Sequence, residues 1–190
     1  MNSNPFSLKG KTYLVTGASS GIGAQTAISI SKMGGVVVVC GRNKDKLNEV
    51  FAKLDGVGHQ IIVADLYTQL EDVINNCPKI NGIVYSAGIT KHIPIKYIDK
   101  KNYDSVFNIN YTIPVFLLDK LFKNKKINPN SSIVFISSLA SKFPFKGGTL
   151  YAGAKTALGG RRGRPGPPAA GPAPIRSACP PRRRPRSPPS

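Results

Sequence analysis

The sequence lacks long apolar segments and is poor in acidic residues, histidine and cysteine. Of 190 residues, only 9 are acidic, 2 are histidine and 3 are cysteine. No run approaches the roughly 18 apolar residues of a membrane-spanning helix, so we expect no membrane association. Residues 1–10 contain no apolar core of the kind found in secretory signals. These absences favour a cytoplasmic protein.

The cysteines and histidines form no metal-binding pattern. Cys40, Cys77 and Cys179 are odd in number and have no metal-ligand spacing. His59 and His92 fit no ligand or catalytic cluster, and we expect both at the surface or in loops. We therefore predict reduced thiols and no metal site.

Positive charge divides the chain into two parts. Residues 1–158 hold 18 Lys, one Arg and all 9 acidic residues, a net charge of +10. Residues 159–190 hold eight Arg, no Lys and no acidic residue, a net charge of +8, and ten of the 16 prolines. We predict one domain with a core over residues 1–158 and a low-complexity, disordered tail over residues 159–190.

Two interpretations of the tail stay open. Residues 1–158 favour amino acids with AT-rich codons, such as Asn, Lys and Ile, whereas the tail favours Pro, Arg, Gly and Ala. This contrast favours a frameshift, an assembly join or a read-through after Leu158. The alternative is a basic tail that binds nucleic acid or another polyanion. Because we favour the first interpretation, nucleic acid is not an expected partner.

Short apolar runs alternate with amphipathic segments. Five runs predict buried strands, at residues 11–16, 36–40, 61–64, 83–85 and 132–136. Four segments predict helices, at residues 22–33, 44–54, 70–76 and 102–123. Pro114 should kink the last helix or displace its start. The alternation predicts an α/β fold, a Rossmann-type doubly wound parallel sheet.

A glycine-rich turn, Thr16-Gly-Ala-Ser-Ser-Gly-Ile-Gly23, follows the first expected strand. Glycine lets the backbone approach a pyrophosphate closely, and the helix N-terminus offers free N–H groups and a positive dipole end. Glycines also serve ordinary tight turns, but between a strand and a helix they indicate a dinucleotide site.

The end of the second strand favours NADP over NAD. A carboxylate there would hold the 2′-hydroxyl of NAD. The chain has Gly41-Arg42-Asn43 instead, so an arginine is available for a 2′-phosphate. The alternative is an exposed arginine without a ligand.

Tyr151 and Lys155 stand four residues apart, and Ser138 precedes the tyrosine by thirteen residues. On a helix, this spacing puts the phenol and the amine on one face. A lysine cation favours the phenolate, so the phenol can exchange a proton with a carbonyl or alcohol oxygen. A serine hydroxyl at the same oxygen would orient the substrate.

Together these motifs resemble the short-chain dehydrogenase/reductase family of the NADP-preferring type. The matches keep the family's order and spacing over residues 8–158, at Thr16, Gly17, Gly21, Gly23, Asp65, Ala87, Gly88, Asn110, Ser138, Tyr151 and Lys155. The opening is most similar to 3-oxoacyl-[acyl-carrier-protein] reductases. The resemblance implies hydride transfer between NADP(H) and a ketone or secondary alcohol, on a small or carrier-bound substrate.

The resemblance also implies residue roles. Tyr151 would be the general acid, with Lys155 beside it holding the nicotinamide ribose. Ser138 would orient the carbonyl, and Asn110 would support a water in the proton relay. Asp65 would contact the adenine, unless it is an ordinary turn residue. The implied cofactor-binding residues are Gly17, Ser19, Ser20, Gly21, Ile22, Gly23, Arg42, Asp65, Ala87, Gly88, Tyr151 and Lys155.

The chain departs from the family pattern at several points. Ser86 stands where an asparagine is usual, and Ser20 stands where many NADP-preferring members have a basic residue. Family members continue the Tyr151 helix into a dimer interface and add two parallel strands, which the proline-rich tail cannot supply. We therefore expect a sheet incomplete on its C-terminal side, low stability, doubtful homo-oligomerisation and little turnover. A catalytically inactive nucleotide-binding protein is the alternative function.

Overall fold

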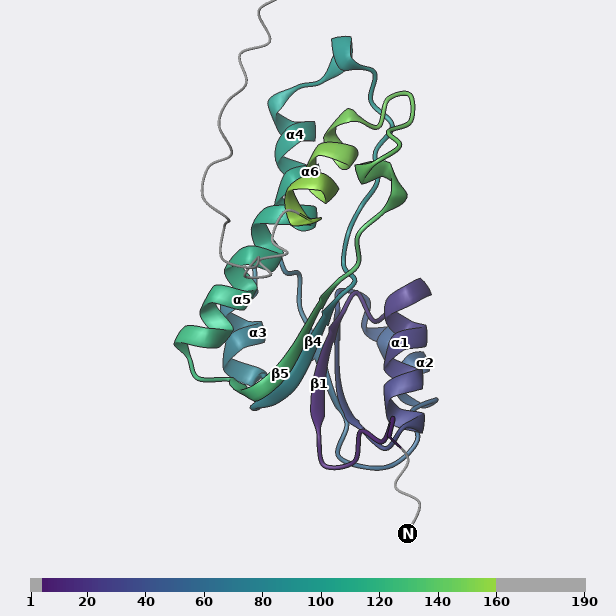
Figure 1. Ribbon diagram of the computed structural model, residues 1–190, viewed down its shortest axis with the longest axis vertical. Coiled ribbons are helices and arrows are strands. Elements are labelled where there is room, and N and C mark those ends of the chain that lie inside the picture. The colour runs from purple at the N-terminus through teal and green to yellow at the C-terminus, as the bar shows by residue number, and fades with distance from the viewer. Residues whose placement is uncertain (1–4, 160–190) are drawn as a thin grey trace, which may run out of the picture.

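The computed structural model describes residues 5–159, which form a parallel sheet with helices on both faces (Figure 1). The sheet contains β1 (Thr12–Thr16), β2 (Val36–Gly41), β3 (Gln60–Val63), β4 (Ile80–Tyr85) and β5 (Ile127–Phe135). The order is β3-β2-β1-β4-β5, and every pair is parallel. This is the beginning of the dinucleotide-binding order, so the predicted Rossmann-type, doubly wound sheet is confirmed.

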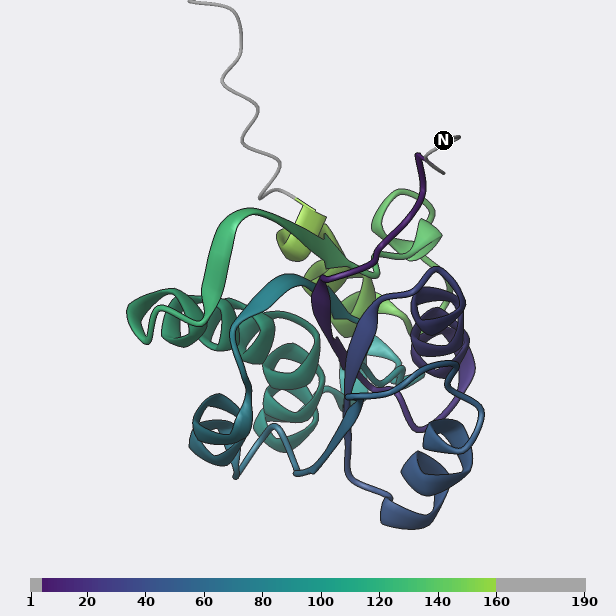
Figure 2. The ribbon, with the colours of Figure 1, turned by 90° about the horizontal axis from the view of Figure 1, so that it is seen from below.

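Helices cover both faces of this sheet (Figure 2). One face carries α1 (Gly21–Lys32) and α2 (Lys44–Phe51), and the other carries α3 (Leu70–Asn76) and α5 (Ile113–Lys123). The remaining helices are α4 (Lys100–Phe107), which leads into α5, and α6 (Thr149–Gly159), which packs against α4. Within the described residues, no helix is both long and apolar enough to cross a membrane. Apart from Gly159, the predicted tail lies outside the described residues.

Each central strand contributes side chains to two hydrophobic cores, because successive side chains point to opposite faces of the sheet. Leu14 and Val38 pack with α3 and α5, whereas Val15 and Val39 pack with α1 and α2. All four side chains are completely buried. These two-sided strands explain the continuous apolar runs in the sequence.

Strand β5 differs from the prediction and from the central strands. It begins at Ile127, so the predicted start at residue 132 is too late. The polar stretch before residue 132 resembles a turn, but it forms an irregular part of the strand. Asn130 has a φ of 59°, and the Ser131 hydroxyl donates to Ile80 O at 3.2 Å. In the described part of the sheet, β5 is an edge strand with Val134 44% exposed.

Candidate active site

The glycine-rich turn is built from backbone packed on backbone. A Cβ on Gly17 would lie 2.8 Å from Ala87 Cα, and one on Gly23 would lie 2.3 Å from Gly17 O. Gly21, with a φ of 56°, differs because no described atom lies within 4 Å of a Cβ at its position. Gly17 and Gly23 therefore allow the turn to pack closely against neighbouring backbone, while the space beside Gly21 stays open for a ligand.

The N-terminus of α1 faces this open side. Its first turn has no acidic residue, and the side chain of Ser20 makes no capping hydrogen bond in the described chain. Ile22 is 60% exposed, an unusual position for a large apolar side chain. The helix end therefore presents uncompensated N–H groups and an apolar side chain to whatever fills the adjoining pocket.

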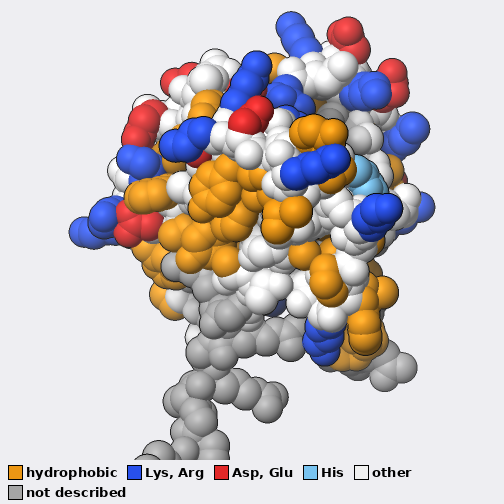
Figure 3. All heavy atoms as spheres, turned by 90° about the horizontal axis from the view of Figure 1, so that it is seen from above, with side chains coloured by type: hydrophobic (Ala, Val, Ile, Leu, Met, Phe, Trp, Pro, Cys, Tyr) orange, Lys and Arg blue, Asp and Glu red, His pale blue; other side chains and the backbone are white. Residues whose placement is uncertain are grey.

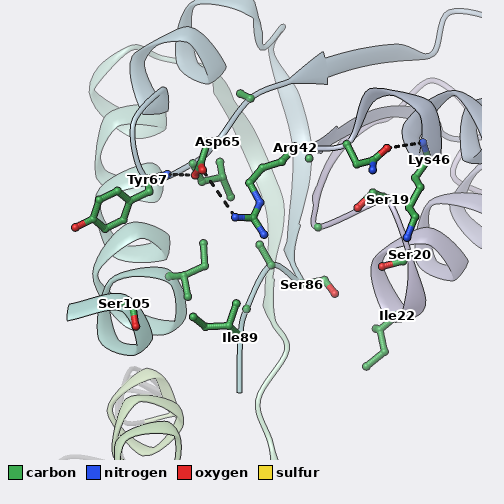
Figure 4. Close-up of a pocket in the computed structure, with 18 of the residues that line it drawn as sticks. Ser19, Ser20, Ile22, Arg42, Lys46, Asp65, Tyr67, Ser86, Ile89 and Ser105 are labelled. Atoms are coloured by element: carbon green, nitrogen blue, oxygen red, sulfur yellow. Dashed lines mark hydrogen bonds and ion pairs between the residues drawn. The ribbon is translucent and has the colours of Figure 1, made fainter. Parts of the chain in front are cut away.

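A pocket of about 1080 Å³ lies along the carboxyl ends of the strands (Figure 4). Its walls include eight of the predicted cofactor residues, namely Gly17, Ser19, Ser20, Ile22, Arg42, Asp65, Ala87 and Gly88. Of the other predicted residues, Gly21 and Gly23 belong to the turn, and Tyr151 and Lys155 lie on α6. The size and chemistry of these walls fit an extended dinucleotide.

Arg42 and Asp65 face one another in the wall of the pocket (Figure 4). The Arg42 guanidinium lies 3.8 Å from an Asp65 carboxylate oxygen. The other Asp65 oxygen accepts a hydrogen bond from Tyr67 N at 2.9 Å, which forms a local turn. Asp65 thus combines the turn role that was its alternative interpretation with a position in the pocket wall. Arg42 is exposed and free to reach a ligand at modest cost, because exposed ion pairs are weak.

Lys46 is a pocket residue that the sequence analysis missed. It lies in the first turn of α2, where the side chain of Asn43 caps the helix by accepting from Lys46 N at 2.9 Å. The Lys46 side chain extends toward Ser20 (Figure 4). The sequence held a signal for Lys46. Asn43 is a typical N-cap residue, so a helix is expected to begin just after Arg42 and to place Lys46 in its first turn. Lys46 thus brings a cation to the turn that lacks a basic residue at position 20.

Asn110 lies where the predicted long helix is distorted. A π-helical segment, Asn108–Thr112, separates α4 from α5, and Pro114 stands in the first turn of α5, so the predicted single helix is divided just before this proline. The Asn110 amide nitrogen donates to Val106 O at 2.9 Å and to Ile89 O at 2.8 Å. Because the amide nitrogen points to these two carbonyls, the side-chain oxygen of Asn110 points away from them.

The Asn110 side-chain oxygen is buried and has no hydrogen-bond partner among residues 5–159. It lies beside Gly88, because a Cβ there would be 2.6 Å from this oxygen and 3.6 Å from Lys155 Nζ. An unsatisfied buried acceptor is costly, and such atoms mark water or ligand sites. Gly88 therefore lines the pocket and also lies beside a hydrogen-bond acceptor, the Asn110 oxygen, and a cation, the Lys155 amine.

Tyr151 and Lys155 lie on one face of α6, as predicted from their spacing. Lys155 Nζ donates to Ile136 O at 2.8 Å and lies 5.7 Å from the centre of the Tyr151 ring. Lys155 is only 5% exposed, and this burial lowers the pKa of its amine below the ordinary value of 10.5. The cation is held against the end of β5, with the phenol as a neighbour.

Ser138 directly precedes the short 3₁₀ helix Leu139–Ser141 and caps it. Its hydroxyl oxygen accepts from Ala140 N at 3.2 Å, while its carbonyl accepts from the Ser141 hydroxyl at 2.7 Å. Thr156 on α6 donates to Ser141 O at 3.2 Å. This bond ties the segment that carries Ser138 to the helix that carries Tyr151.

Cys40, Cys77 and both histidines lie outside the walls of this pocket, and Cys179 lies outside the described residues. Cys40 and Cys77 are free and buried, and burial raises the pKa of Cys40 to about 12 and that of Cys77 to about 11. His59 lies in the loop before β3, where Val37 N donates to its ring, and His92 lies in an exposed loop. The described residues contain no group of His, Cys, Asp and Glu suited to a metal ion.

Comparison with known proteins places this geometry in a family. The family model described as "short chain dehydrogenase" matches residues 11–161. The chain is 26% identical to hydroxynaphthalene reductase of Aspergillus fumigatus, with 80% of this chain and 59% of the relative covered. It is 31% identical to 3-oxoacyl-[acyl-carrier-protein] reductase of Rickettsia felis, over 80% and 63% of the two chains.

A solved structure agrees with these matches. A short chain dehydrogenase of Escherichia coli CFT073, complexed with NADPH, superimposes with a TM-score of 0.71 at 28% identity. The match covers 80% of this chain and 69% of that one. The chain spans about three fifths of the length of the curated relatives it matches. By its fold, its turn and its sequence, the chain belongs to the short-chain dehydrogenase family.

Proposed function

We propose that this chain carries the site of an NADP(H)-dependent oxidoreductase that interconverts a ketone and a secondary alcohol. One observation carries the proposal: the buried Lys155 amine and the unsatisfied Asn110 oxygen lie beside Gly88 of the pocket wall, and the Tyr151 ring lies next to the same amine. Family membership and the named reductases among the relatives support it.

The residues divide the chemistry among them. NADPH, when bound, supplies the hydride to the carbonyl carbon. Tyr151 donates its phenolic proton to the carbonyl oxygen, and the Ser138 hydroxyl donates a hydrogen bond to that oxygen as its charge grows. The Lys155 cation stabilises the phenolate that remains. Asn110 holds a water that returns a proton toward Lys155, which uses its unpaired oxygen.

NADP is the preferred cofactor in this proposal, and NAD is less favoured. Arg42 and Lys46 bring two cations to the pocket from either side of Asn43, and strand β2 ends without a carboxylate. A 2′-phosphate would draw Arg42 from Asp65 and accept from both side chains. The Lys46 amine replaces the basic residue that many family members carry at the position of Ser20.

The substrate in this proposal is a small-molecule or carrier-bound carbonyl compound, and a 3-oxoacyl thioester is one candidate. The Rickettsia felis relative is named for that substrate. The free, buried thiols of Cys40 and Cys77 support a reducing, cytoplasmic setting.

A second candidate function is nucleotide binding without turnover. The observation that favours it is the edge position of β5 in the described sheet, because this strand leads directly into Ile136, the carbonyl partner of Lys155, and then to Ser138. An unpaired edge holds such groups less firmly than a central strand does.

One experiment separates the two functions. Purified 190-residue protein is titrated with NADPH by fluorescence and then assayed at 340 nm with a panel of ketones. The main proposal expects binding and NADPH oxidation, slow because the sheet is expected to be incomplete, with tighter binding of NADPH than of NADH. Lys46→Ala should weaken NADPH binding and leave NADH binding unchanged, and Lys44→Ala is the matched control. Binding without oxidation supports the second candidate, and absence of binding contradicts both.

A further inference from the structure

Tyr85, the last residue of β4, lies directly behind the wall of the pocket. The residue is only 1% exposed and does not line the pocket, whereas Ser86, which follows it, and Ile109 both do. Figure 3 looks onto the end of the molecule where α4 and α6 lie, and there hydrophobic side chains share the surface with lysines and arginines. Tyr85 belongs to no such surface, so it can affect a reaction in the pocket only through the residues that it contacts.

The Tyr85 hydroxyl donates to Ile109 O at 2.9 Å, inside the π-helical segment. This carbonyl lacks both of its ordinary helical donors. Ile113 N, its α-helical partner, donates to Asn108 O instead, and its π-helical partner would be Pro114, which has no N–H. Burial raises the pKa of the Tyr85 phenol well above its ordinary value of 10.0, so the hydroxyl keeps its proton and remains a donor. Tyr85 therefore supplies a hydrogen bond that the distorted helix cannot supply itself.

This bond acts on the peptide unit that leads into Asn110. The Ile109 carbonyl and the Asn110 nitrogen belong to one peptide plane, so a shift of the first moves the second. Asn110 is completely buried, and its side-chain oxygen has no hydrogen-bond partner among residues 5–159. That oxygen lies beside Gly88, only three residues after Tyr85. Both sides of this contact therefore depend on Tyr85, Gly88 through the chain and Asn110 through the hydroxyl.

The backbone of Tyr85 reaches the Lys155 amine by a second route. Tyr85 O accepts from Ile136 N at 3.0 Å, and Ile136 O accepts from Lys155 Nζ at 2.8 Å. The Tyr85 ring also packs beside that of Phe135 on β5, with the ring centres 6.4 Å apart. Tyr85 thus contacts both segments that hold the polar groups beside Gly88.

We propose that Tyr85 is a positioning residue whose hydroxyl holds the Asn110 oxygen in place beside Gly88. The inference rests on the proposed function, in which Asn110 holds a water that returns a proton toward Lys155. Without the hydroxyl, Ile109 O becomes a buried acceptor without a partner, and only a rearranged π-helical segment can satisfy it. The Asn110 oxygen then leaves its place, while the glycine-rich turn stays untouched.

Tyr85→Phe removes the hydroxyl and keeps the ring, and ethyl acetoacetate serves as the ketone probe. The single-turnover rate of NADPH oxidation should fall about 10- to 100-fold, because a small displacement of a catalytic group is costly, while NADPH affinity stays within about twofold of wild type. Tyr13→Phe is the matched control, because its ring packs on the opposite face of the sheet, and it should change neither value. A rate that falls no further in Tyr85→Phe than in Tyr13→Phe would overturn the proposal.

A double-mutant cycle shows whether Tyr85 acts through Asn110. If it does, Tyr85→Phe combined with Asn110→Ala should be no slower than Asn110→Ala alone. Two rate losses that multiply would place the action of Tyr85 elsewhere and overturn the proposal. Circular dichroism checks that the variants are folded, and sucrose in the buffer favours the folded state of any that are not.

Hydrogen exchange separates this inference from the proposed function, because it needs no turnover. Tyr85→Phe should speed exchange about tenfold or more at residues 108–113 and leave residues 36–41 of β2 unchanged, whereas Tyr13→Phe should not affect residues 108–113. If wild type does not oxidise NADPH, the proposed function fails, and this exchange pattern alone decides the inference. Unchanged exchange at residues 108–113, or equal acceleration in β2, would overturn it.

Discussion

The proposed cofactor side and the proposed catalytic side of this molecule, called below the cofactor side and the catalytic side, are built differently. The cofactor side is one continuous unit, β1–α1–β2, whose strands are buried among neighbours on both edges. The catalytic side collects Asn110, Ser138 and Tyr151 from three separate segments. Part of it rests on β5, an edge strand of the described sheet whose residues are mostly exposed.

This difference follows from what the two proposed kinds of chemistry require. Pyrophosphate binding needs only close backbone and a helix end, which adjacent residues can supply. Proton transfer needs groups of different kinds at one point, so the chain must bring distant segments together. Substitutions on the catalytic side should therefore leave NADPH binding on the cofactor side intact, whereas substitutions on the cofactor side should also impair catalysis. The following predictions test that asymmetry, from the largest effect to the smallest.

Replacement of Tyr151 by Phe should separate catalysis from binding most sharply. The variant loses the proton donor but keeps the ring, so NADPH oxidation should fall by about 10²- to 10⁴-fold. NADPH affinity should change little, because the glycine-rich turn is untouched. Tyr103→Phe, on α4, is the matched control and should behave as wild type. Equal loss of oxidation in both variants would show that Tyr151 has no special role.

Core truncation should cost far more on the cofactor side than at the edge. Leu14 on β1 is completely buried, and Leu14→Ala should lower the free energy of unfolding by about 2–5 kcal/mol. Ile133 on β5 is 37% exposed, so Ile133→Ala should cost clearly less. Urea unfolding of both variants measures the difference. Equal costs would mean that β5 is covered as well as β1.

Gly17 should prove to be a packing glycine as well as a turn residue. Gly17→Ala combines a φ of 66° with a contact of 2.8 Å to Ala87, so it should cost more than the about 1–3 kcal/mol of backbone strain alone. Gly10→Ala is the control, because its φ is 72° and no described atom lies within 4 Å of the added Cβ. Thermal unfolding of the two variants isolates the steric part, and identical midpoints would rule it out.

The pH dependence should report the burial of Lys155. Burial lowers the pKa of its amine in the folded protein below 10.5, so the cation is lost at a lower pH than in the unfolded chain. NADPH oxidation should fall as pH rises through that folded pKa. Over the same interval the unfolded chain binds more protons, so this group's contribution to stability rises with pH.

Lys155→Arg tests the assignment of this alkaline limb. Arginine stays charged at alkaline pH. The loss of NADPH oxidation that residue 155 causes should therefore disappear or move to higher pH in the variant, even if its absolute rate differs from that of wild type. Circular dichroism over the same pH range confirms that the variant stays folded. An unchanged pH profile would assign the limb to another group.

The sequence predicted the parts of the site that are local in the chain. The glycine-rich turn, Arg42 and the Tyr151–Lys155 face follow from spacing on a strand or a helix. The π-helical segment at Asn110 was signalled only by Pro114, because its shape depends on side chains that bond to freed carbonyls. One such bond runs from the Tyr85 hydroxyl to Ile109 O at 2.9 Å.

Other features could not be predicted because they depend on tertiary contacts. The first part of β5 pairs irregularly with β4, and its sequence is typical of a turn, so the early start of the strand could not be predicted. The contact between the His92 and Phe145 rings requires two loops to meet, and no periodic pattern in the sequence marks either residue. Lys46 was within reach of helix geometry, but its direction toward Ser20 depends on how α2 packs.

The central proposal is that the described five-stranded unit binds NADPH through its glycine-rich turn. Hydrogen exchange of the 190-residue protein, measured by mass spectrometry with and without NADPH, tests it most directly. The account predicts slower exchange at residues 17–23 and 86–89 when NADPH is bound, and little change along the middle of β5. Unchanged exchange at the glycine-rich turn under saturating NADPH would contradict the claim.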